Sequence, residues 1–313
     1  MFASKESLIG NHPKFVKAVE FANNVAVTKA PVLIVGESGS GKKTFSQFIH
    51  DNSARKEGSF HVVNCNADAK AVENEILGHR DEATGSFNKG VLERANMGTV
   101  VLENIDALED KFQKRLFNIL QELSDYDLDV RIVATTSKNL SKYVGAGRFY
   151  RALYTHFSGS QINLIPLRER GSDIETLANH FVAAWASENN KEAAALSEEA
   201  KTKITSFYWA HNVNELKAVM ENTMANLTTD LIDVNAIELG ERKAEVTSSD
   251  NDEDGFKLMS LKEAERVLIR KALIHTSENR TQAAKILGVS IRTLRNKINE
   301  YRNNGNNYFV NLR

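Results

Sequence analysis

The residues of this chain with the clearest chemical potential form a glycine-rich loop that follows a short apolar stretch. Residues 32–35 are β-prone and apolar, and Gly36-Glu-Ser-Gly-Ser-Gly41 leads into Lys42 and a plausible amphipathic helix. Glycines at this spacing let successive backbone N–H groups face a β-phosphate beside the positive end of a helix. Lys42 would reach the β and γ oxygens, whereas an ordinary Gly/Ser-rich turn needs no lysine there. We predict ATP binding by Gly36, Glu37, Ser38, Gly39, Ser40, Gly41, Lys42, Lys43 and Thr44.

A second group of residues, near the C-terminal end, has the pattern of a DNA-reading module. Residues 281–287 read as a short helix, Gly288-Val289 as a turn, and Ser290 as the N-cap of a further helix. Arginine and asparagine on its free face can read guanine and adenine edges, while nearby lysines neutralise phosphates. The alternative is a helical dimerisation hairpin with a solvated charged face. The predicted DNA-binding residues are Arg280, Thr281, Lys285, Ser290, Arg292, Thr293, Arg295, Asn296 and Lys297.

The apolar spacing of the same module predicts which side chains face its core. Residues on one face of a helix recur every three or four positions. The predicted inward side chains are Leu261, Ala264, Leu268 and Ala272 in a first helix, and Ile291, Leu294, Ile298 and Tyr301 in the last helix.

Composition places the chain among soluble globular proteins. Its 313 residues are 42% apolar and 26% charged, with a net charge of −1, so two or three domains with real cores can form. Basic residues outnumber acids at 257–302, whereas 241–254 is acidic. The single Cys65 excludes an internal disulfide framework, and no apolar run approaches the ~20 residues of a membrane span. We expect a cytoplasmic protein with no membrane partner.

Alternating elements position the loop. Strands are predicted at 32–35, 60–64, 99–104, 130–135 and 161–165. A helix at 14–29 precedes the first strand, and helices between the strands include 110–122 and 141–149. Short apolar strands that alternate with helices indicate a parallel sheet with helices on both faces. From residue 173 the strands should stop, and helices follow at 173–189, 197–207 and 212–227. The stripe Leu177, Phe181 and Trp185 reads as a packed helix face.

Several stretches together resemble the bacterial enhancer-binding proteins, the AAA+ activators of sigma-54 RNA polymerase. The matching stretches are Gly36–Lys42, Val63-Asn-Cys65, Leu77-Gly-His79, Leu164–Arg170 with Asp173-Ile174, Trp209–Leu216 and the Fis-like 281–288. The resemblance implies an α/β fold: an AAA+ P-loop parallel sheet with helices on both faces, a small all-α subdomain, and a C-terminal Fis-type helix-turn-helix. We expect these parts at 1–170, 171–240 and 257–313, with an acidic flexible linker at 241–256. The family's usual N-terminal receiver domain has no counterpart here.

The residues that this resemblance assigns to hydrolysis are altered. The family's Asp-Glu pair appears as Glu103-Asn104, so Glu103 could still serve Mg²⁺ but Asn104 cannot act as a base. The glutamate's partner corresponds to Asn64. Lys43 replaces an acid after the loop, which either places a cation where the metal would sit or adds a phosphate contact.

Further motif positions are altered as well. The two arginine fingers correspond to Tyr150 and His156, with an off-register Arg151 between them, and the two sensor positions to Asn214 and Ser137. The loop that touches sigma-54 is reduced to Ala83-Thr-Gly-Ser86. Loss of an arginine finger typically costs ~10³-fold or more in hydrolysis. We therefore expect ATP binding with weak or absent turnover, and no intact catalytic residue.

Among degenerate members of the family, the chain resembles regulators of biofilm-matrix genes. That resemblance implies activation with sigma-70 rather than sigma-54 polymerase, and cyclic di-GMP as effector. The arginine and asparagine positions that hold the dinucleotide in a related flagellar regulator correspond here to Glu6, Gln47 and Phe48, so that pocket is not preserved. Arg168, Arg170 and Lys43 are candidate anion contacts, although an ion pair with Glu169 or Asp173 explains the two arginines better.

Together these observations predict a DNA-binding transcription activator with a nucleotide-binding core, acting as a homodimer rather than a hexamer. Two alternatives stay open. One is a working ATPase that remodels sigma-54 polymerase, with Glu103 or Arg151 in place of lost groups. The other is a DNA-occupying repressor with a vestigial phosphate loop.

Overall fold

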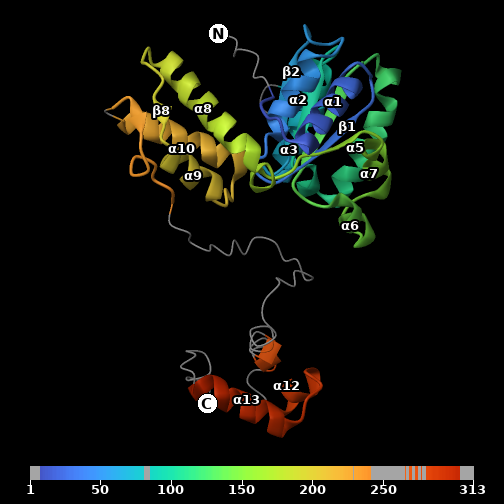
Figure 1. Ribbon diagram of the computed structural model, residues 1–313. Coiled ribbons are helices and arrows are strands. Elements are labelled where there is room, and N and C mark those ends of the chain that lie inside the picture. The colour runs from blue at the N-terminus through green and yellow to red at the C-terminus, as the bar shows by residue number, and fades with distance from the viewer. Residues whose placement is uncertain are drawn as a thin grey trace. The chain divides into compact units, whose positions relative to one another are not determined.

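The computed structural model describes residues 8–80, 85–227, 229–240 and 280–303, with isolated positions at 265, 268–269, 272–273 and 276. The chain divides into two compact units, Met1–Gly240 and Glu241–Arg313 (Figure 1). The predicted linker at 241–256 lies outside the described residues. None of the helices in the described ranges combines the length and the apolar character that crossing a bilayer requires.

A five-stranded parallel sheet forms the centre of the first unit. Its strands, in the spatial order β2-β5-β6-β1-β7, are Phe60–Asn64, Thr99–Glu103, Arg131–Thr136, Val32–Val35 and Gln161–Asn163. All six residues of β6 are buried, as are four of the five in β5, which fits the apolar, β-branched composition of a sheet covered on both sides. Because the strands are parallel, their carboxyl ends meet at one edge, where the glycine-rich loop leaves β1.

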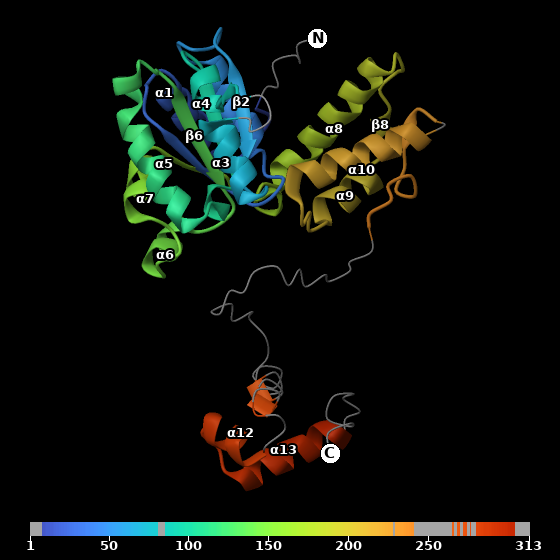
Figure 2. The ribbon, with the colours of Figure 1, turned by 180° about the vertical axis from the view of Figure 1, so that it is seen from behind.

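Helices pack on both faces of this sheet, as Figures 1 and 2 show. They are α1 Pro13–Ala26, α2 Lys42–Asp51, α3 Ala69–Leu77, α4 Val91–Arg94, α5 Asp110–Glu122, α6 Leu140–Gly145 and α7 Arg151–Ser158, with the short 3₁₀ turns η1 Ile105–Ala107 and η2 Leu123–Tyr126. Successive β1 residues enter different cores: Leu33 packs with α5 and α7, and Ile34 packs with α1 and α2. The predicted fold class is confirmed.

A smaller subdomain follows the sheet. It contains the 3₁₀ turn η3 Leu167–Glu169 and the helices α8 Gly171–Glu188, α9 Glu198–Ser206 and α10 Asn212–Asn226. Its core surrounds the fully buried Trp209, and the stripe Leu177, Phe181 and Trp185 packs against that core, as predicted. The expectation that strands stop at 173 is wrong, because β8 Ala195–Leu196 pairs in parallel with β9 Leu231–Ile232. Two-residue strands are too short to leave a periodic signal.

Further elements differ from the predictions, including β7, which ends at Asn163 rather than 165. An antiparallel hairpin, β3 Gly78–Arg80 and β4 Phe87–Lys89, was not expected. Helix α1 ends at Ala26, where the buried Arg131 guanidinium donates to the carbonyls of Val25 and Ala26 at 2.6 and 2.7 Å. Helix α6 ends at Gly145 rather than 149, because Gly147 takes a left-handed conformation, with φ of +72°.

The C-terminal unit contains α12 Arg280–Ile286 and α13 Ile291–Asn303, joined by a turn in which Gly288 has φ of +65°. Leu294, Ile298 and Tyr301 are buried as predicted. Two inward predictions are wrong: Leu268 is 43% exposed, because Ile269 and Leu273 turn inward instead, and Ile291 is 37% exposed at the very start of α13. Leu261 and Ala264 lie outside the described residues.

Candidate nucleotide site and DNA-binding face

The phosphate loop begins where β1 ends. The Gly36 N–H donates to the Thr136 carbonyl of β6 at 3.1 Å, which ties the loop to the neighbouring strand. Gly39 and Gly41 have φ of +73° and +97°, and Gly41 is the N-cap of α2, so both positions need glycine. These features give the bent loop before a helix N-terminus that the sequence indicates.

Lys42 lies across this loop. Its Nζ donates to the carbonyls of Gly36 at 2.7 Å and Glu37 at 2.9 Å. Burial lowers the pKa of Lys42, and the carboxylates of Glu103, Asp106 and Glu37 partly offset that effect. The ammonium is therefore held at the loop by weak carbonyl acceptors, which phosphate oxygens can replace.

The loop has the form of an open cradle for an anion. A Cβ added at Gly41 would meet nothing within 4 Å, and the buried Ser40 hydroxyl has no hydrogen-bond partner among the described residues. Lys43 is exposed and Thr44 is half-buried, both in the first turn of α2. Lys43 makes no ion pair within the described ranges. These residues fit a polyphosphate.

The carboxyl edge of β5 carries one carboxylate and one amide. Glu103 ends the strand, and Asn104 follows in a left-handed conformation with φ of +56°. The Asn104 amide donates to the Asn64 Oδ1 at 3.1 Å, so the two amides pair with each other. Ser137, after β6, is exposed. An amide has no titratable oxygen, so neither asparagine can take a proton from an attacking water.

Arg168 and Asn212 join the small subdomain to the loop. The Arg168 guanidinium donates to both Glu37 carboxylate oxygens, at 2.7 and 2.6 Å, and this contact lowers the pKa of Glu37. Asn212 donates to the Glu37 Oε2 at 3.2 Å and to the Ser38 carbonyl at 2.9 Å. Arg168 therefore forms an ion pair, as expected, but its partner is Glu37 rather than Glu169 or Asp173.

Arg170 does form the expected structural pair. Its Nε lies 2.9 Å from the Asp173 Oδ2, and both side chains are almost fully buried. Burial lowers the pKa of Arg170, and Asp173 opposes that shift. Neither member of this pair is free to bind a ligand.

The N-terminus of α10 lies directly on the loop. The backbone N–H of Val213 donates to the Gly39 carbonyl at 3.0 Å, and Asn214, at the sensor position, is an exposed neighbour of the same glycine. Sequence reasoning missed Glu37 and Asn212 as members of this contact. Asn212 lies within the Trp209–Leu216 motif, in which the family resemblance indicates only Asn214 as a site residue.

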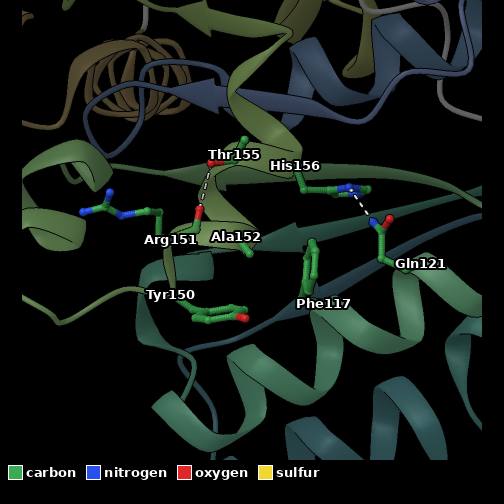
Figure 3. A pocket seen from close by; sticks show the side chains of 7 residues that line it. All are labelled: Phe117, Gln121, Tyr150, Arg151, Ala152, Thr155 and His156. Atoms are coloured by element: carbon green, nitrogen blue, oxygen red, sulfur yellow. Dashed lines mark hydrogen bonds between the residues drawn. The ribbon is translucent and has the colours of Figure 1, made fainter.

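The two finger positions lie on a shallow groove of about 610 Å³ between α5 and α7 (Figure 3). Tyr150 and His156 both pack edge-on against Phe117, with ring centroids 5.8 and 6.2 Å apart. Burial lowers the pKa of His156, so this ring is neutral at pH 7 and does not replace an arginine's charge. Arg151 is exposed and points away from the rings in Figure 3.

Other predicted positions have a definite place or lie outside the described residues. Glu6, Ala83 and Thr84 are not described, and Gly85 precedes Phe87, which is 58% exposed on β4. The Gln47 amide donates to Asp51 within α2 at 2.8 Å.

The C-terminal unit presents most of its predicted DNA-binding residues to solvent. Thr281, Lys285, Arg292, Arg295 and Asn296 are exposed. Ser290 caps α13 as predicted: its Oγ accepts from the Thr293 N–H at 3.0 Å and lies 2.7 Å from the Thr293 hydroxyl. Arg280 is half-buried.

Lys297 differs from the other cations of this face. It is half-buried and ion-paired with Glu265 at 3.0 Å and Glu300 at 3.6 Å, and the Glu265 contact raises its pKa. Carboxylates of the same unit therefore already pair with the Lys297 charge.

Comparison with known proteins agrees with this geometry. The family models described as sigma-54 interaction domain, AAA+ ATPase lid domain, and bacterial regulatory protein, Fis family, match residues 8–163, 168–254 and 260–301. The chain is 32% identical over 326 residues to the transcriptional regulatory protein FlbD of Caulobacter vibrioides, covering 96% of this chain and 71% of FlbD. It is 32% identical over 311 residues to the regulatory protein AtoC of Escherichia coli, covering 94% and 67%.

The fold is also that of a solved structure. The crystal structure of NtrX from Brucella abortus in complex with ADP aligns with a TM-score of 0.67 at 21% identity, covering 95% of this chain and 69% of that one. Fold and site therefore define an AAA+ nucleotide-binding domain joined to a Fis-type helix-turn-helix. The chain belongs to the sigma-54 activators of the enhancer-binding type, a family of DNA-binding transcription regulators that act on RNA polymerase.

Proposed function

We propose that this chain is a transcription activator whose AAA+ domain binds ATP and hydrolyses it slowly or not at all. The observation that carries the proposal is the pairing of an intact phosphate loop with the Asn64–Asn104 amide pair beside it. In this proposal residues 1–170 and 171–240 form the nucleotide-binding part and 257–313 bind DNA, with 241–256 as the linker.

Binding of ATP is supported by the loop itself. Lys42 supplies a cation, the loop and α2 supply backbone N–H groups, and Ser40 offers a hydroxyl without a partner. NtrX of Brucella abortus, which shares the fold, has been crystallised with ADP and with ATP. Lys43 and Thr44, in the first turn of α2, would add contacts to the phosphates.

Four altered positions support slow hydrolysis. Asn104 cannot act as a general base, Tyr150 is uncharged, and burial keeps His156 neutral. Asn214 cannot supply the charge of the sensor arginine that it replaces. Glu103 keeps one carboxylate for Mg²⁺, a cofactor that polarises the phosphates when bound.

DNA binding belongs to the exposed face of α13. Arg292, Arg295 and Asn296 suit base edges, whereas Arg280 and Lys285 suit phosphates, and Thr281 lies exposed beside them. We further propose a homodimer on a twofold site, because an assembly without arginine fingers has less reason to close into a hexamer.

Two finer parts of the proposal rest on the resemblance to biofilm regulators. They are the use of sigma-70 polymerase rather than sigma-54 polymerase, and cyclic di-GMP as effector, with action in the cytoplasm. The shortened contact segment before β4 supports the first part. Gln47 is engaged with Asp51, so the dinucleotide would use a pocket other than the one at positions 6, 47 and 48.

Calorimetry with a non-hydrolysable ATP analogue tests nucleotide binding. The wild type should bind the analogue, and Lys42→Ala should lose at least about tenfold in affinity, because one charge-assisted contact is worth roughly 1.5–3 kcal/mol. The exposed Lys111→Ala on α5 is the matched control and should bind normally. No binding by the wild type would leave the repressor alternative.

Turnover and effector binding are measured on the same proteins. ATP hydrolysis should stay near background as protein concentration rises, whereas turnover that increases with concentration would favour the active ATPase. Heat from cyclic di-GMP that survives Lys42→Ala would place the effector outside the loop, and no heat would remove that part of the proposal.

A further inference from the structure

One carboxylate at the carboxyl edge of the sheet, beside the phosphate loop, does not belong to any of the family's motifs. Asp106 is the middle residue of η1, directly after the turn at Asn104, and is half-buried. Its Oδ1 accepts a hydrogen bond of 2.5 Å from the Thr136 hydroxyl. The backbone carbonyl of Thr136 in turn accepts a hydrogen bond from the Gly36 N–H of the phosphate loop. Asp106 is thus two hydrogen bonds from the start of that loop.

The backbone explains why this residue reaches the edge. A left-handed residue at Asn104, with φ of +56°, turns the chain sharply at the end of β5 and starts η1 at once. Ile105 is fully buried beneath the turn, so the next side chain emerges beside Thr136, at the same edge as Glu103. Two carboxylates, separated in sequence by Asn104 and Ile105, therefore lie at the carboxyl end of β5.

Both carboxylates act electrostatically on the same two groups. Glu103 and Asp106 each favour the protonated form of Lys42, and each adds to the raised pKa of the buried Cys65, which burial mainly lifts to about 12. Neither carboxylate makes a direct ion pair with Lys42 in the described part of the chain. The Asp106 Oδ2 also has no hydrogen bond within the described ranges, so one oxygen is available for a ligand.

We propose that Asp106 replaces the lost second carboxylate of the family, and with Glu103 holds the divalent cation of bound Mg²⁺–ATP. Carboxylate oxygens are the protein ligands that Mg²⁺ prefers, together with the substrate's phosphates. The open cradle at Gly41 and the Ser40 hydroxyl, which has no partner among the described residues, fit the phosphates of the nucleotide. The inference rests on the proposed binding of ATP.

This assignment makes nucleotide binding metal-dependent without restoring hydrolysis. Asp106 and Glu103 would shield the phosphate charge through the metal, while the position of the general base stays an amide at Asn104. The pair would therefore favour a long-lived bound state over a turnover cycle, which suits a nucleotide that acts as a structural ligand.

The test compares affinity for a non-hydrolysable ATP analogue in MgCl₂ and in EDTA. The wild type should bind more tightly with Mg²⁺, and Asp106→Asn should lose most of that gain, roughly 10- to 100-fold, as expected when a metal-site contact is removed. Affinity in EDTA should be unchanged or higher, because a negative charge near the phosphates is gone. Mn²⁺ bound in the presence of the analogue, counted by electron paramagnetic resonance, should fall in parallel.

Two controls separate a metal ligand from a structural residue. Glu109→Gln removes an exposed carboxylate nearby and should keep the wild-type response to Mg²⁺. Thr136→Val removes the hydrogen bond but keeps the Asp106 carboxylate, so the response to Mg²⁺ should largely persist. Asparagine keeps an acceptor for Thr136, so unchanged Mg²⁺ dependence in Asp106→Asn would overturn the proposal.

Failure of this inference is distinct from failure of the proposed function. Equal binding by the wild type in MgCl₂ and EDTA would overturn the metal role and leave ATP binding in place. No analogue binding under either condition would overturn both.

Discussion

The substitution that most changes the chemistry of this AAA+ domain is an amide, at Asn104, in place of the family's carboxylate. Asn64 and Asn104 donate and accept within their own pair at 3.1 Å, in a place where a glutamate would need to bind and deprotonate water. The cationic part of the site is kept, since Lys42 stays within reach of the loop carbonyls. In the proposed function, these single residues separate nucleotide binding from nucleotide hydrolysis.

The pair between Glu37 and Arg168 predicts a pH dependence at the residue scale. The Arg168 hydrogen bonds lower the pKa of Glu37 from its ordinary value of 4.5, so the contact stabilises the fold above that value and is lost as pH falls through the folded-state pKa. Glu37→Gln should reduce the free energy of unfolding by up to about 1 kcal/mol at neutral pH, because the pair is partly exposed.

Urea unfolding across a pH series checks this expectation. The difference between the wild type and Glu37→Gln should be constant near neutral pH and shrink below 4.5. Glu169→Gln, which alters an exposed carboxylate next to the same arginine, should show no such difference. A gap between wild type and Glu37→Gln that persists in acid would show that the stabilisation is not ionic.

Between elements, the decisive contact is the one that α10 makes with the phosphate loop. The Val213 N–H and the Asn212 side chain both donate to carbonyls of the loop, so a change in the loop's shape would disturb its contact with the small subdomain. A nucleotide that draws Lys42 away from Gly36 and Glu37 would change the loop on which Arg168 and α10 rest. The phosphate loop and the small subdomain are therefore connected by direct hydrogen bonds.

Gly39→Ala should break that link. A Cβ there would lie 2.0 Å from the His211 carbonyl, in a backbone conformation with φ of +73°, so α10 must move as well as the loop. Gly41→Ala is the matched control, because it carries similar strain at φ of +97° but meets nothing within 4 Å. Strain alone costs about 1–2 kcal/mol, and Gly39→Ala should cost clearly more.

Hydrogen exchange and urea unfolding distinguish the two variants. The Val213 amide should exchange faster in Gly39→Ala and at the wild-type rate in Gly41→Ala. Equal destabilisation in the two variants, with Val213 still protected in both, would contradict a direct contact between α10 and the loop.

For the molecule as a whole, the nucleotide-binding unit and the DNA-binding unit are separate bodies with separate cores. DNA affinity should therefore depend on α13 and tolerate changes in the sheet. Arg292→Ala and Arg295→Ala should each cost about 1–3 kcal/mol in binding a specific site and relax its sequence preference, if they read base edges.

A competition assay between specific and non-specific duplexes measures both effects. Arg148→Ala, which removes an exposed arginine of the first unit, should leave affinity and preference unchanged. The DNA-binding role of α13 fails if the double variant Arg292→Ala/Arg295→Ala binds like the wild type. A constant preference with lower affinity would mean that the arginines contact phosphates.

Much of the fold could be predicted because its signals are local. The apolar runs of β2 and the amphipathic spacing of α5 set their bounds to the residue. The phosphate loop needs only its glycines and lysine in order, and Ser290 needs only its position before an amphipathic helix. Local propensity fails at Ile291 and Leu268, where neighbouring helices decide which side of a helix faces the core.

The sequence by itself determined the class of domain, the helix-turn-helix and the altered chemistry at Asn104, because each depends on residue types at short spacings. Only the tertiary structure decided that Arg168 binds Glu37, 131 positions away, that Asn212 joins the loop to α10, and that Asp106 accepts a hydrogen bond from Thr136 at the end of β6. Such contacts depend on how parallel strands align their carboxyl ends and how a helix end meets a loop. No spacing along the chain encodes those distances, because they arise when distant segments pack together.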